Sequence, residues 1–313
     1  MTAAMRVFPS DHHPLPLPTG HRFPLDKYRL LRERLERAAA AGAPLEFVAP
    51  HAATDDEILR VHDRAYVGRV LSGTLSADEV RRIGFPWSEG LVRRSLVSTG
   101  AAVDAAAAAL SDGAAASLAG GTHHAGPDWG EGYCVFNDVA VAAREMQARG
   151  AAARVAIVDL DVHQGNGTAA IFGGDPTVFT ASVHGERNFP LRKHPGSLDV
   201  GLPDAADDDA YLAAVDLAVA GAVTRWRPDL ILYIAGADPY SGDRLGRLAV
   251  TREGLAERDR RVFAAAVAVG APVAVVCGGG YAPDLSAVVE IHAATMLQAA
   301  AMTQAGAFGR GGK

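Results

Sequence analysis

The stretch Arg154-Val155-Ala156-Ile157-Val158-Asp159-Leu160-Asp161-Val162-His163 gives the strongest indication of how this chain folds. Its apolar, partly β-branched first half predicts a buried strand over residues 155–160. Because side chains alternate along a strand, Asp159, Asp161 and His163 point the same way at its carboxyl end. A carboxylate and an imidazole two residues apart on one face can both bind one divalent cation of zinc type. The stretch therefore predicts half of a metal site, although such residues after a strand also form turns or cap helices.

Apolar runs and helical patterns alternate along most of the chain, after a start that is predicted to be irregular as far as Leu25. Further strands are predicted over residues 178–183, 230–235 and 273–277, and helices over residues 25–41, 98–109, 139–149, 168–172, 209–225, 252–268 and 285–300. Such alternation is typical of a mainly parallel sheet with helices on both faces, so we predict an α/β fold with three α/β/α layers. No internal repeat or linker divides the chain, so we expect one domain over residues 1–304 and a mobile glycine-rich tail over residues 305–313.

A third metal ligand is expected, because catalytic zinc sites usually take three protein ligands and leave one position open. Asp238 is the best candidate, since it follows the apolar run Leu230-Ile231-Leu232-Tyr233-Ile234-Ala235 after only two small residues. Sites in open parallel sheets form at the carboxyl ends of the strands, where Asp238 is expected to emerge with Asp161 and His163. Asp238-Pro239 is also ordinary turn material, which is the alternative interpretation.

Two glycine-rich loops carry candidates for the chemistry. Gly120-Gly121-Thr122 precedes the paired histidines His123 and His124, which could divide a general-base role and an electrostatic role between them. Gly278-Gly279-Gly280-Tyr281 follows the predicted strand over residues 273–277 and presents a phenol that could donate a hydrogen bond to an oxyanion. The plainer interpretations are exposed loop histidines and a tyrosine that packs against the next helix.

The composition is that of a protein with a large core and a slightly acidic surface. Hydrophobic residues make up 49% of the 313 residues, and the formal charge of −6 argues against direct nucleic-acid binding through a basic face. Cys134 and Cys277 lie in apolar contexts that suit a reducing cytosol. Residues 1–18 lack the apolar core of a secretion signal, and the stretches 101–110 and 263–276 are too short or too interrupted to span a bilayer. We therefore expect a cytoplasmic protein without a membrane partner, whose oligomeric state the sequence does not indicate.

Five blocks of sequence together resemble the histone deacetylase family. In chain order they are Gly120-Gly121-Thr122-His123-His124-Ala125, Gly132-Tyr133-Cys134-Val135-Phe136-Asn137-Asp138, Asp159-Leu160-Asp161-Val162-His163-Gln164-Gly165-Asn166-Gly167-Thr168, Gly236-Ala237-Asp238 and Gly278-Gly279-Gly280-Tyr281. Each block alone is a weak signal, whereas five in the family's order are specific. The segments Gly20-His21-Arg22-Phe23-Pro24 and Ser241-Gly242-Asp243-Arg244-Leu245-Gly246 look like the bacterial deacetylase-like branch nearest the class IV enzymes. The resemblance implies the arginase/deacetylase-like fold and hydrolysis of an amide.

The resemblance also implies a role for each residue that matches a family motif. Asp161, His163 and Asp238 would bind Zn²⁺, with Fe²⁺ as the alternative because two carboxylates and an imidazole suit either metal. His124 would be the general base and later the acid for the leaving amine, while His123 would act mainly electrostatically. Tyr281 would polarise the substrate carbonyl and stabilise the oxyanion together with the metal.

Residues around this centre take supporting roles by the same resemblance. Asp159 would bind the imidazole of His123, and Asn166 that of His124. A structural K⁺ would be held at the places that correspond to Asp159, Asp161, His163, Ser182 and Val183. A narrow acyl-lysine tunnel would be lined by Gly132, Tyr133 and Phe189. An ordinary strand-end hydroxyl at Ser182 and simple packing of the two aromatic rings are the alternatives.

Asn166 departs from some members of the family, which carry aspartate at this place. A neutral amide can orient an imidazole, but it stabilises the protonated form less than a carboxylate does. We therefore expect His124 to lose its proton more easily here than in those relatives.

Three functions are compatible with a chain of this kind. The first is a metal-dependent amidohydrolase that acts on an acyl-lysine protein or peptide, or on an acylated small amine, with an acyl length that the sequence does not set. The second is an arginase-like ureohydrolase with two manganese ions, which would need additional carboxylates where Asn166, Gly236 and Tyr240 stand. The third is a non-catalytic acyl-lysine binding protein, whose signature would be loss of a base or phenol that His124 and Tyr281 retain.

Overall fold

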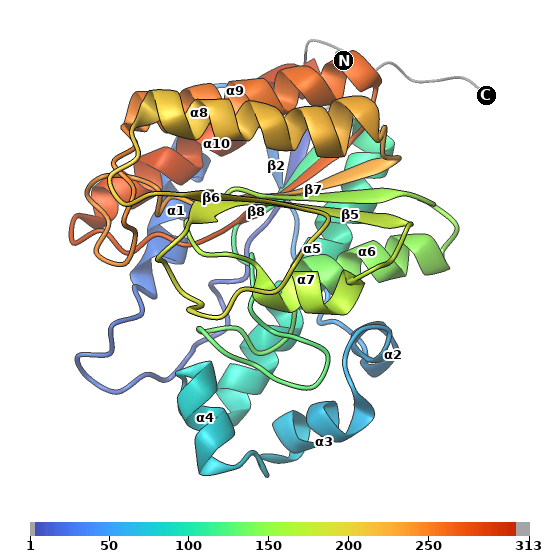
Figure 1. Ribbon diagram of the computed structural model, residues 1–313. Coiled ribbons are helices and arrows are strands. Elements are labelled where there is room, and N and C mark those ends of the chain that lie inside the picture. Colours follow the sequence, from blue (N-terminus) through green and yellow to red (C-terminus); the bar gives the residue numbers. More distant parts are fainter. Residues whose placement is uncertain (1–3, 305–313) are drawn as a thin grey trace.

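A single eight-stranded sheet, in which every strand runs parallel to its neighbours, forms the centre of the computed structural model, which describes residues 4–304 (Figure 1). The strands lie in the order β2-β1-β3-β8-β7-β4-β5-β6. Their bounds are β1 Met5–Phe8, β2 Leu45–Phe47, β3 Ala114–Ser117, β4 Val155–Asp159, β5 Val178–Gly185, β6 Leu198–Leu202, β7 Leu230–Ala235 and β8 Val273–Cys277. The predicted α/β fold around a parallel sheet is confirmed.

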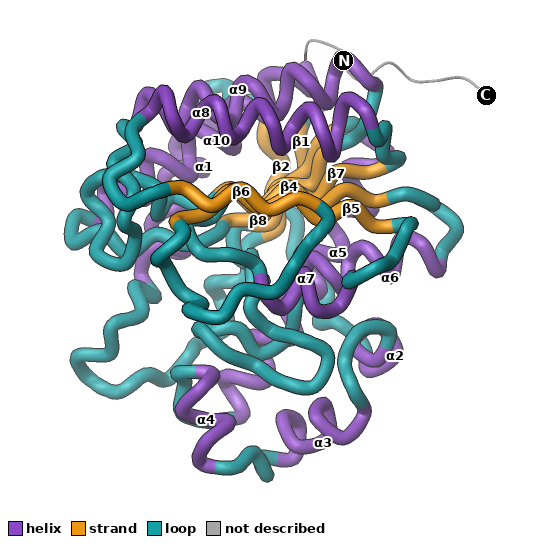
Figure 2. Tube along the Cα trace, viewed as in Figure 1, coloured by secondary structure: helices purple, strands orange, loops and turns teal. Residues whose placement is uncertain are grey.

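Helices cover both faces of the sheet, which lies as a layer between them (Figure 2). One face carries α1 (Asp26–Ala40), α8 (Asp208–Val219) with the π-helical turn η1 (Ala220–Arg225), α9 (Arg252–Val269) and α10 (Leu285–Gln304). The other side carries α2 (Asp55–Leu59), α3 (Arg64–Ser72), α4 (Ala77–Ile83), α5 (Glu89–Asp112), α6 (Asp138–Ala148) and α7 (Asn166–Phe172). In β4, Ala156 and Val158 pack into the first core and Val155 and Ile157 into the second, so the whole strand is apolar and buried.

The register of the central strands brings three loops to one edge of the sheet. Asp159 at the end of β4 lies opposite Ile234 of β7, and Ala235 lies opposite Cys277 of β8. The loops that follow are bonded together as well, because the N–H of Ala237 donates to the carbonyl of Gly279 at 2.9 Å. Segments that are distant in the sequence therefore meet beyond the carboxyl ends of β4, β7 and β8.

The prediction of an irregular start was wrong for Met5–Phe8, which forms an internal strand of the sheet with fully buried Met5 and Val7. A strand of four residues is too short to show a clear period. The helix predicted over residues 98–109 begins earlier, because Ser88 caps α5 by accepting from the N–H of Leu91. The helix predicted over residues 209–225 ends in the π-helical turn η1.

Helix α10 is, among the described residues, long and apolar enough to cross a membrane by length and composition. It packs against α1 and α9, and 56% of its most apolar window is buried inside the protein. Burial in the core accounts for this composition, as it does for other core helices of α/β proteins. The tail predicted to be mobile, residues 305–313, lies outside the described residues.

Candidate functional site

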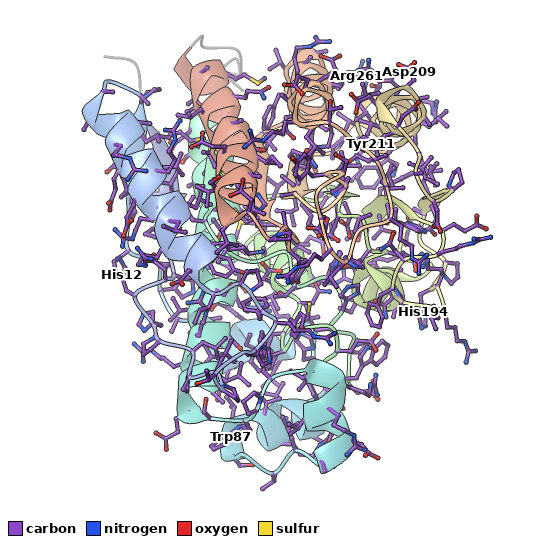
Figure 3. All side chains as sticks on the ribbon, turned by 90° about the vertical axis from the view of Figure 1, so that its left-hand side faces the viewer. His12, Trp87, His194, Asp209, Tyr211 and Arg261 are labelled. Carbon is purple, nitrogen blue, oxygen red and sulfur yellow. The ribbon has the colours of Figure 1, made fainter. Side chains whose placement is uncertain are left out.

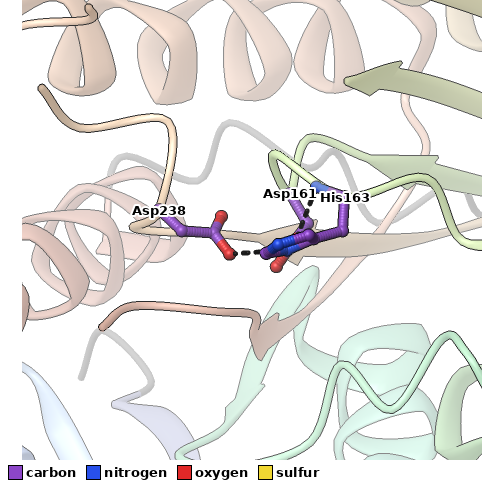
Figure 4. Close-up of side chains that lie close together, drawn as sticks. All are labelled: Asp161, His163 and Asp238. Atoms are coloured by element: carbon purple, nitrogen blue, oxygen red, sulfur yellow. Dashed lines mark hydrogen bonds and ion pairs between the residues drawn. The ribbon is translucent and has the colours of Figure 1, made fainter. Parts of the chain in front are cut away.

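Three buried side chains meet where β4 and β7 end. Asp161 and His163 follow β4, Asp238 follows β7, and their ligand atoms lie within 4.8 Å of one another (Figure 4). Nδ1 of His163 is 3.0 Å from Oδ1 of Asp161 and 3.2 Å from Oδ2 of Asp238. Within the part of the chain that the structure describes, this is the one group of three or more histidine, cysteine or acidic residues that could hold a metal ion.

The main chain fixes both oxygens of Asp161 and one oxygen of Asp238. Oδ1 of Asp161 accepts from the N–H of His163 at 2.9 Å. Oδ2 of Asp161 accepts from the N–H of Gly279 at 2.5 Å, and Oδ1 of Asp238 accepts from the N–H of Val162 at 2.9 Å. Oδ2 of Asp238 is buried and accepts no hydrogen bond in the described part of the chain. A buried carboxylate oxygen that accepts no hydrogen bond is costly unless it pairs with or coordinates a cation, and its ion-pair contact here is Nδ1 of His163 at 3.2 Å. The donor set thus fits a metal ion with three protein ligands.

The charges of these groups also favour a cation. Burial raises the pKa of the Asp238 carboxyl to about 7, and the nearby carboxylate of Asp161 adds to the rise. Burial lowers the pKa of the His163 imidazole, but Asp161 and Asp238 outweigh it and raise this pKa to about 10. Carboxylates therefore already stabilise positive charge at this point, and two carboxylates with one imidazole suit Zn²⁺ or Fe²⁺.

The hydrogen bonds of Asn166 determine the tautomer of His124. Nδ1 of His124 lies 2.7 Å from Oδ1 of Asn166, and Nδ2 of Asn166 donates to Oε1 of Glu131 at 2.5 Å. Because a carboxylate only accepts, the amide presents its NH₂ group to Glu131 and its oxygen to His124. Nδ1 of His124 is therefore the protonated nitrogen, and Nε2 is left as the basic one.

The two adjacent imidazoles differ in charge at neutral pH. Burial lowers the pKa of His123, but the carboxylates of Asp159 and Asp161 outweigh it and raise this pKa to about 9; Nδ1 of His123 is 2.6 Å from Oδ2 of Asp159. Burial, with His123 and His163 nearby, holds the pKa of His124 well below its ordinary value. His123 is therefore cationic and His124 neutral, although their ring centroids are only 4.2 Å apart.

A cavity opens onto these groups and brings most of the predicted site together. Its walls include Gly132, Tyr133, Tyr281, His123, His124, Asp161 and His163. Gly132 has φ +58°, and a Cβ at this position would lie 2.7 Å from the ring of His124, so a glycine is required. Burial holds the pKa of the Tyr281 phenol well above its ordinary value, so it stays a hydrogen-bond donor.

Phe189 lies beside the site but does not line the cavity. Its ring meets the ring of His124 edge-on at 4.9 Å between centroids, and 41% of the residue is exposed. Tyr133 instead lies 5.1 Å from Phe85 and 6.2 Å from Tyr281, between ring centroids. A tunnel wall formed by Phe189 stays a prediction.

The residues predicted to hold a monovalent cation are partly assembled. Asp159 and Ser182 are partners in the register of β4 and β5, and both line a small cavity with Thr180 and Asp199. Oγ of Ser182 is 2.9 Å from Nδ1 of His184. Val183 is buried on the next position of β5 and is not part of this cavity. The K⁺ site stays a prediction.

Comparison with known proteins gives the family. The histone deacetylase domain matches this chain over residues 21–296. The chain belongs to the histone deacetylase family. An uncharacterized protein of Picosynechococcus is 46% identical to this family member over 91% of the chain and 96% of the relative. A histone deacetylase-like amidohydrolase of Pseudomonas aeruginosa is 32% identical over 85% of the chain and 74% of the relative.

A solved structure of a histone deacetylase homologue complexed with SAHA has the same fold. Its TM-score with this chain is 0.80, over 96% of this chain and 84% of the other, at 22% sequence identity. The arginase/deacetylase-like fold implied by the sequence motifs of this histone deacetylase family member is therefore confirmed.

Three charged residues of this histone deacetylase family member were missed from the sequence. Glu131 fixes Asn166, and it directly precedes the motif that begins at Gly132. Lys27 is buried with Nζ 3.4 Å from the carbonyl of Gly278 and 5.3 Å from the ring centroid of Tyr281. Arg94 is buried and lines the cavity. Lys27 falls within a predicted helix, where a charged residue is usually assigned to the solvent face.

Proposed function

We propose that this protein is a metal-dependent amidohydrolase that removes acetyl or longer acyl groups from lysine side chains or from acylated small amines. The observation that carries the proposal is the convergence of Asp161, His163 and Asp238 beside a histidine whose basic nitrogen is fixed. Membership of the histone deacetylase family supports a deacetylase reaction. When bound, Zn²⁺ or Fe²⁺ would supply Lewis-acid polarisation of the carbonyl and a lower pKa for water.

His124 carries the proton transfers in this mechanism. Its neutral imidazole accepts a proton from the attacking water at Nε2, while Nδ1–H keeps its bond to Asn166. The same nitrogen later gives the proton to the departing amine, which restores the neutral ring. The nearby cationic His123, held by Asp159, disfavours a second positive charge on His124 and so favours return of the proton.

Tyr281 and two buried cations act on the acyl group. The Tyr281 hydroxyl donates a hydrogen bond to the carbonyl oxygen as negative charge develops there. The wall of the same cavity also includes Lys27 and Arg94, together with Ser95 and Thr99, which carry hydroxyls. The positive charges of Lys27 and Arg94 attract the negatively charged carboxylate that the reaction releases. The acyl group of the substrate carries no charge, so it is not attracted in the same way.

We further propose a structural K⁺ at Asp159 and Ser182 and a cytoplasmic location. The small cavity beside β4 and β5, with its carboxylates and hydroxyls, supports the first proposal, because alkali cations take oxygen ligands. The two cysteines, Cys134 and Cys277, are both free and buried, which supports work in a reducing compartment.

The two other functions lack support from the geometry. A binuclear manganese centre needs more carboxylates, and among the described residues Asp161, His163 and Asp238 form no larger group. A non-catalytic binding protein does not need a base of fixed tautomer and a phenol in one cavity, yet His124 and Tyr281 both line it.

The proposal is tested with purified full-length protein loaded in turn with Zn²⁺ and Fe²⁺. Substrates are acetyl-, butyryl- and myristoyl-lysine peptides and acetylated polyamines, and release of the free amine is measured. We expect metal-dependent release from at least one class, with the preferred acyl length set by the cavity. Binding of these compounds without hydrolysis in metal-loaded protein would support the non-catalytic alternative, and two metal ions per chain would support the arginase-like one.

Asn166→Asp is expected to move the acidic limb of the pH profile of kcat/KM to higher pH. A carboxylate stabilises the imidazolium form of His124, so the pKa of this base rises and it stays protonated up to a higher pH. Because the new carboxylate would face Glu131, the double variant with Glu131→Gln is measured beside it and should show the same direction. An acidic limb that stays in place in both variants contradicts the assigned role of Asn166.

Glu131→Gln is expected to lower kcat by about 10-fold with little change in KM, as for other residues that orient a site side chain. A glutamine can present either its oxygen or its NH₂ group, so the Asn166 amide loses the acceptor-only partner that fixes which of its ends faces His124. Arg82→Gln is the matched control, since Nη2 of Arg82 lies 3.8 Å from the other oxygen of Glu131 and its side chain is half exposed. Equal losses of kcat in the two variants would show that the Glu131–Arg82 pair, rather than the bond to Asn166, carries the effect.

A further inference from the structure

A cluster of buried polar residues lies next to the loops that carry the metal ligands, on the face of the sheet that α8, α9 and α10 cover. Its centre is the ion pair of Arg258 and Asp259 on α9, with Nε of Arg258 2.9 Å from Oδ1 of Asp259. Asp259 also accepts from the hydroxyls of Tyr233 at 2.5 Å and Thr295 at 2.6 Å. Arg258 and Thr295 are 0% exposed, and Asp259 is 1% exposed. None of these residues lines the cavity.

Arg258 reaches from this cluster to the loop after β7. Its Nη1 donates to the carbonyl of Gly236 at 2.5 Å, two residues before the metal ligand Asp238. Gly236 in turn lies against the loop after β4, because a Cβ at this position would be 2.6 Å from Cα of Asp161. The position of one peptide group, held by a guanidinium, therefore affects the backbone of two metal ligands.

Tyr211 links the same cluster to the loop after β4. It extends from α8, where Figure 3 labels it, and its hydroxyl donates to the carbonyl of Leu160 at 3.2 Å. Leu160 directly precedes Asp161. The Tyr211 hydroxyl also belongs to the surroundings of Arg258: burial lowers the pKa of the guanidinium, but Asp259, Tyr233 and Tyr211 outweigh it and raise this pKa.

We propose that Arg258 and Tyr211 are positioning residues that hold the carbonyls of Gly236 and Leu160 and thereby fix the two loops that carry the metal ligands. The inference rests on the proposed function, because it concerns the metal that the function requires. An isolated buried ion pair is a weak source of stability, since removing two charges from water costs about as much as their attraction returns. The bonds from Arg258 to the loop after β7 and from Tyr211 to the loop after β4 give this cluster a role that stability alone does not explain. Arg261 on the same helix, by contrast, lies at the outer edge in Figure 3 and pairs with Asp216.

The test measures metal affinity and metal geometry rather than activity. Full-length protein is stripped of metal, the Zn²⁺ dissociation constant is measured by competition with a chromogenic chelator, and the visible absorption of the Co²⁺ form is recorded. Arg258→Lys keeps the charge but lacks the planar fork that spans Asp259 and Gly236. Tyr211→Phe removes one hydroxyl. Thr295→Val is the matched control, since the Thr295 hydroxyl donates to Asp259 in the same cluster and to the carbonyl of Ile291, and among the described residues it has no hydrogen bond to either ligand loop.

We expect Arg258→Lys to weaken Zn²⁺ binding by about 10-fold and Tyr211→Phe to weaken it by a smaller factor, as outer contacts of metal ligands typically do. Both should shift the Co²⁺ absorption. Thr295→Val should lower the melting temperature of the metal-free protein while Zn²⁺ affinity and the Co²⁺ spectrum stay as in the wild type.

Two results would overturn the inference. One is wild-type Zn²⁺ affinity in both Arg258→Lys and Tyr211→Phe. The other is a loss of Zn²⁺ affinity in Thr295→Val as large as that in Arg258→Lys and Tyr211→Phe, when all three variants lose the same amount of melting temperature. The cluster would then have only a structural role. If Arg258→Lys does not fold, Tyr211→Phe decides alone. A wild-type protein that binds no metal would overturn the proposed function as well, whereas unchanged variants of a metal-binding wild type overturn the inference alone.

Discussion

Asp238→Asn is expected to abolish tight metal binding and to lower kcat by about 10³-fold or more, because the metal supplies several kcal/mol of transition-state stabilisation. The amide keeps the shape of the side chain and can still accept from the N–H of Val162, so the loop after β7 retains its main-chain bond. What is lost is the carboxylate oxygen Oδ2, which is buried and accepts no hydrogen bond among the described residues. The variant therefore removes a metal ligand while it preserves the structure around that ligand.

The same variant is expected to make the metal-free protein more stable at neutral and higher pH. Burial and then Asp161 raise the pKa of the Asp238 carboxyl to about 7 in the folded state. A carboxyl group whose pKa is raised in the folded state lowers the free energy of unfolding as the pH rises above its pKa in the unfolded state. This loss of stability is complete above its pKa in the folded state. Asp238→Asn removes this cost, so its melting temperature should exceed that of the metal-free wild type above about pH 7 and match it at acidic pH.

Metal content by elemental analysis, thermal unfolding against pH and kcat on an acetyl-lysine peptide together check this result. Asp216→Asn is the control, since Asp216 is an exposed carboxylate on α8 that pairs only with Arg261 among the described residues. Full activity and one metal ion per chain in Asp238→Asn would remove Asp238 from the ligand set.

Tyr281→Phe is expected to lower kcat by about 10²- to 10³-fold, as loss of one oxyanion donor does in other hydrolases. The metal should remain bound, because no ligand atom is changed. KM should change little, since the hydrogen bond strengthens only as charge develops on the carbonyl oxygen. Burial holds the pKa of this phenol well above its ordinary value, so the wild-type donor stays protonated across the working pH range.

The rate measurement on Tyr281→Phe is made at full metal occupancy, with Tyr240→Phe as its control. Tyr240 follows Asp238 in the same loop region but does not line the cavity, so its hydroxyl should have little effect on kcat. Undiminished deacylation by metal-loaded Tyr281→Phe would falsify the assignment of the phenol to catalysis.

The sequence predicts the four adjacent strands β8, β7, β4 and β5, and it misses β1, β2, β3 and β6. β4, β7 and β8 were predicted within a residue because each is buried on both faces, which gives a nearly continuous apolar run in the sequence. β3 was missed although it is just as buried, because its residues are Ala114-Ala115-Ala116-Ser117. Alanine is the best helix former, so a short alanine strand after the long helix α5 cannot be told from a continuation of that helix.

The candidate site was predictable where its chemistry lies in motifs. Asp161, His163 and Asp238 follow buried strands, and the structure brings them together. Glu131 and Arg258 were missed because their roles depend on packing between distant segments. Arg258 lies in the charged run Glu257-Arg258-Asp259-Arg260-Arg261, which is typical of a solvated helix face.

One signal could have revealed the buried pair on α9. Asp259 stands four residues after Leu255 and three before Val262, and these neighbours at helical spacing are both buried. A charged residue on the apolar stripe of an amphipathic helix must find a partner inside the protein. That pattern predicts a buried ion pair, but not the carbonyl that it holds.

The strand order has a consequence for the time at which the protein acquires its metal during synthesis. β4, β7 and β8 are neighbours in the sheet, and they are synthesised in that order. Asp161 and His163 therefore leave the ribosome well before Asp238, and the Gly279 N–H that fixes Asp161 comes later still. Because folding follows the growing chain from its N-terminal end, the complete ligand set cannot form on an early nascent chain. The three proposed ligands are therefore available together only after the loop that follows β7 has been synthesised.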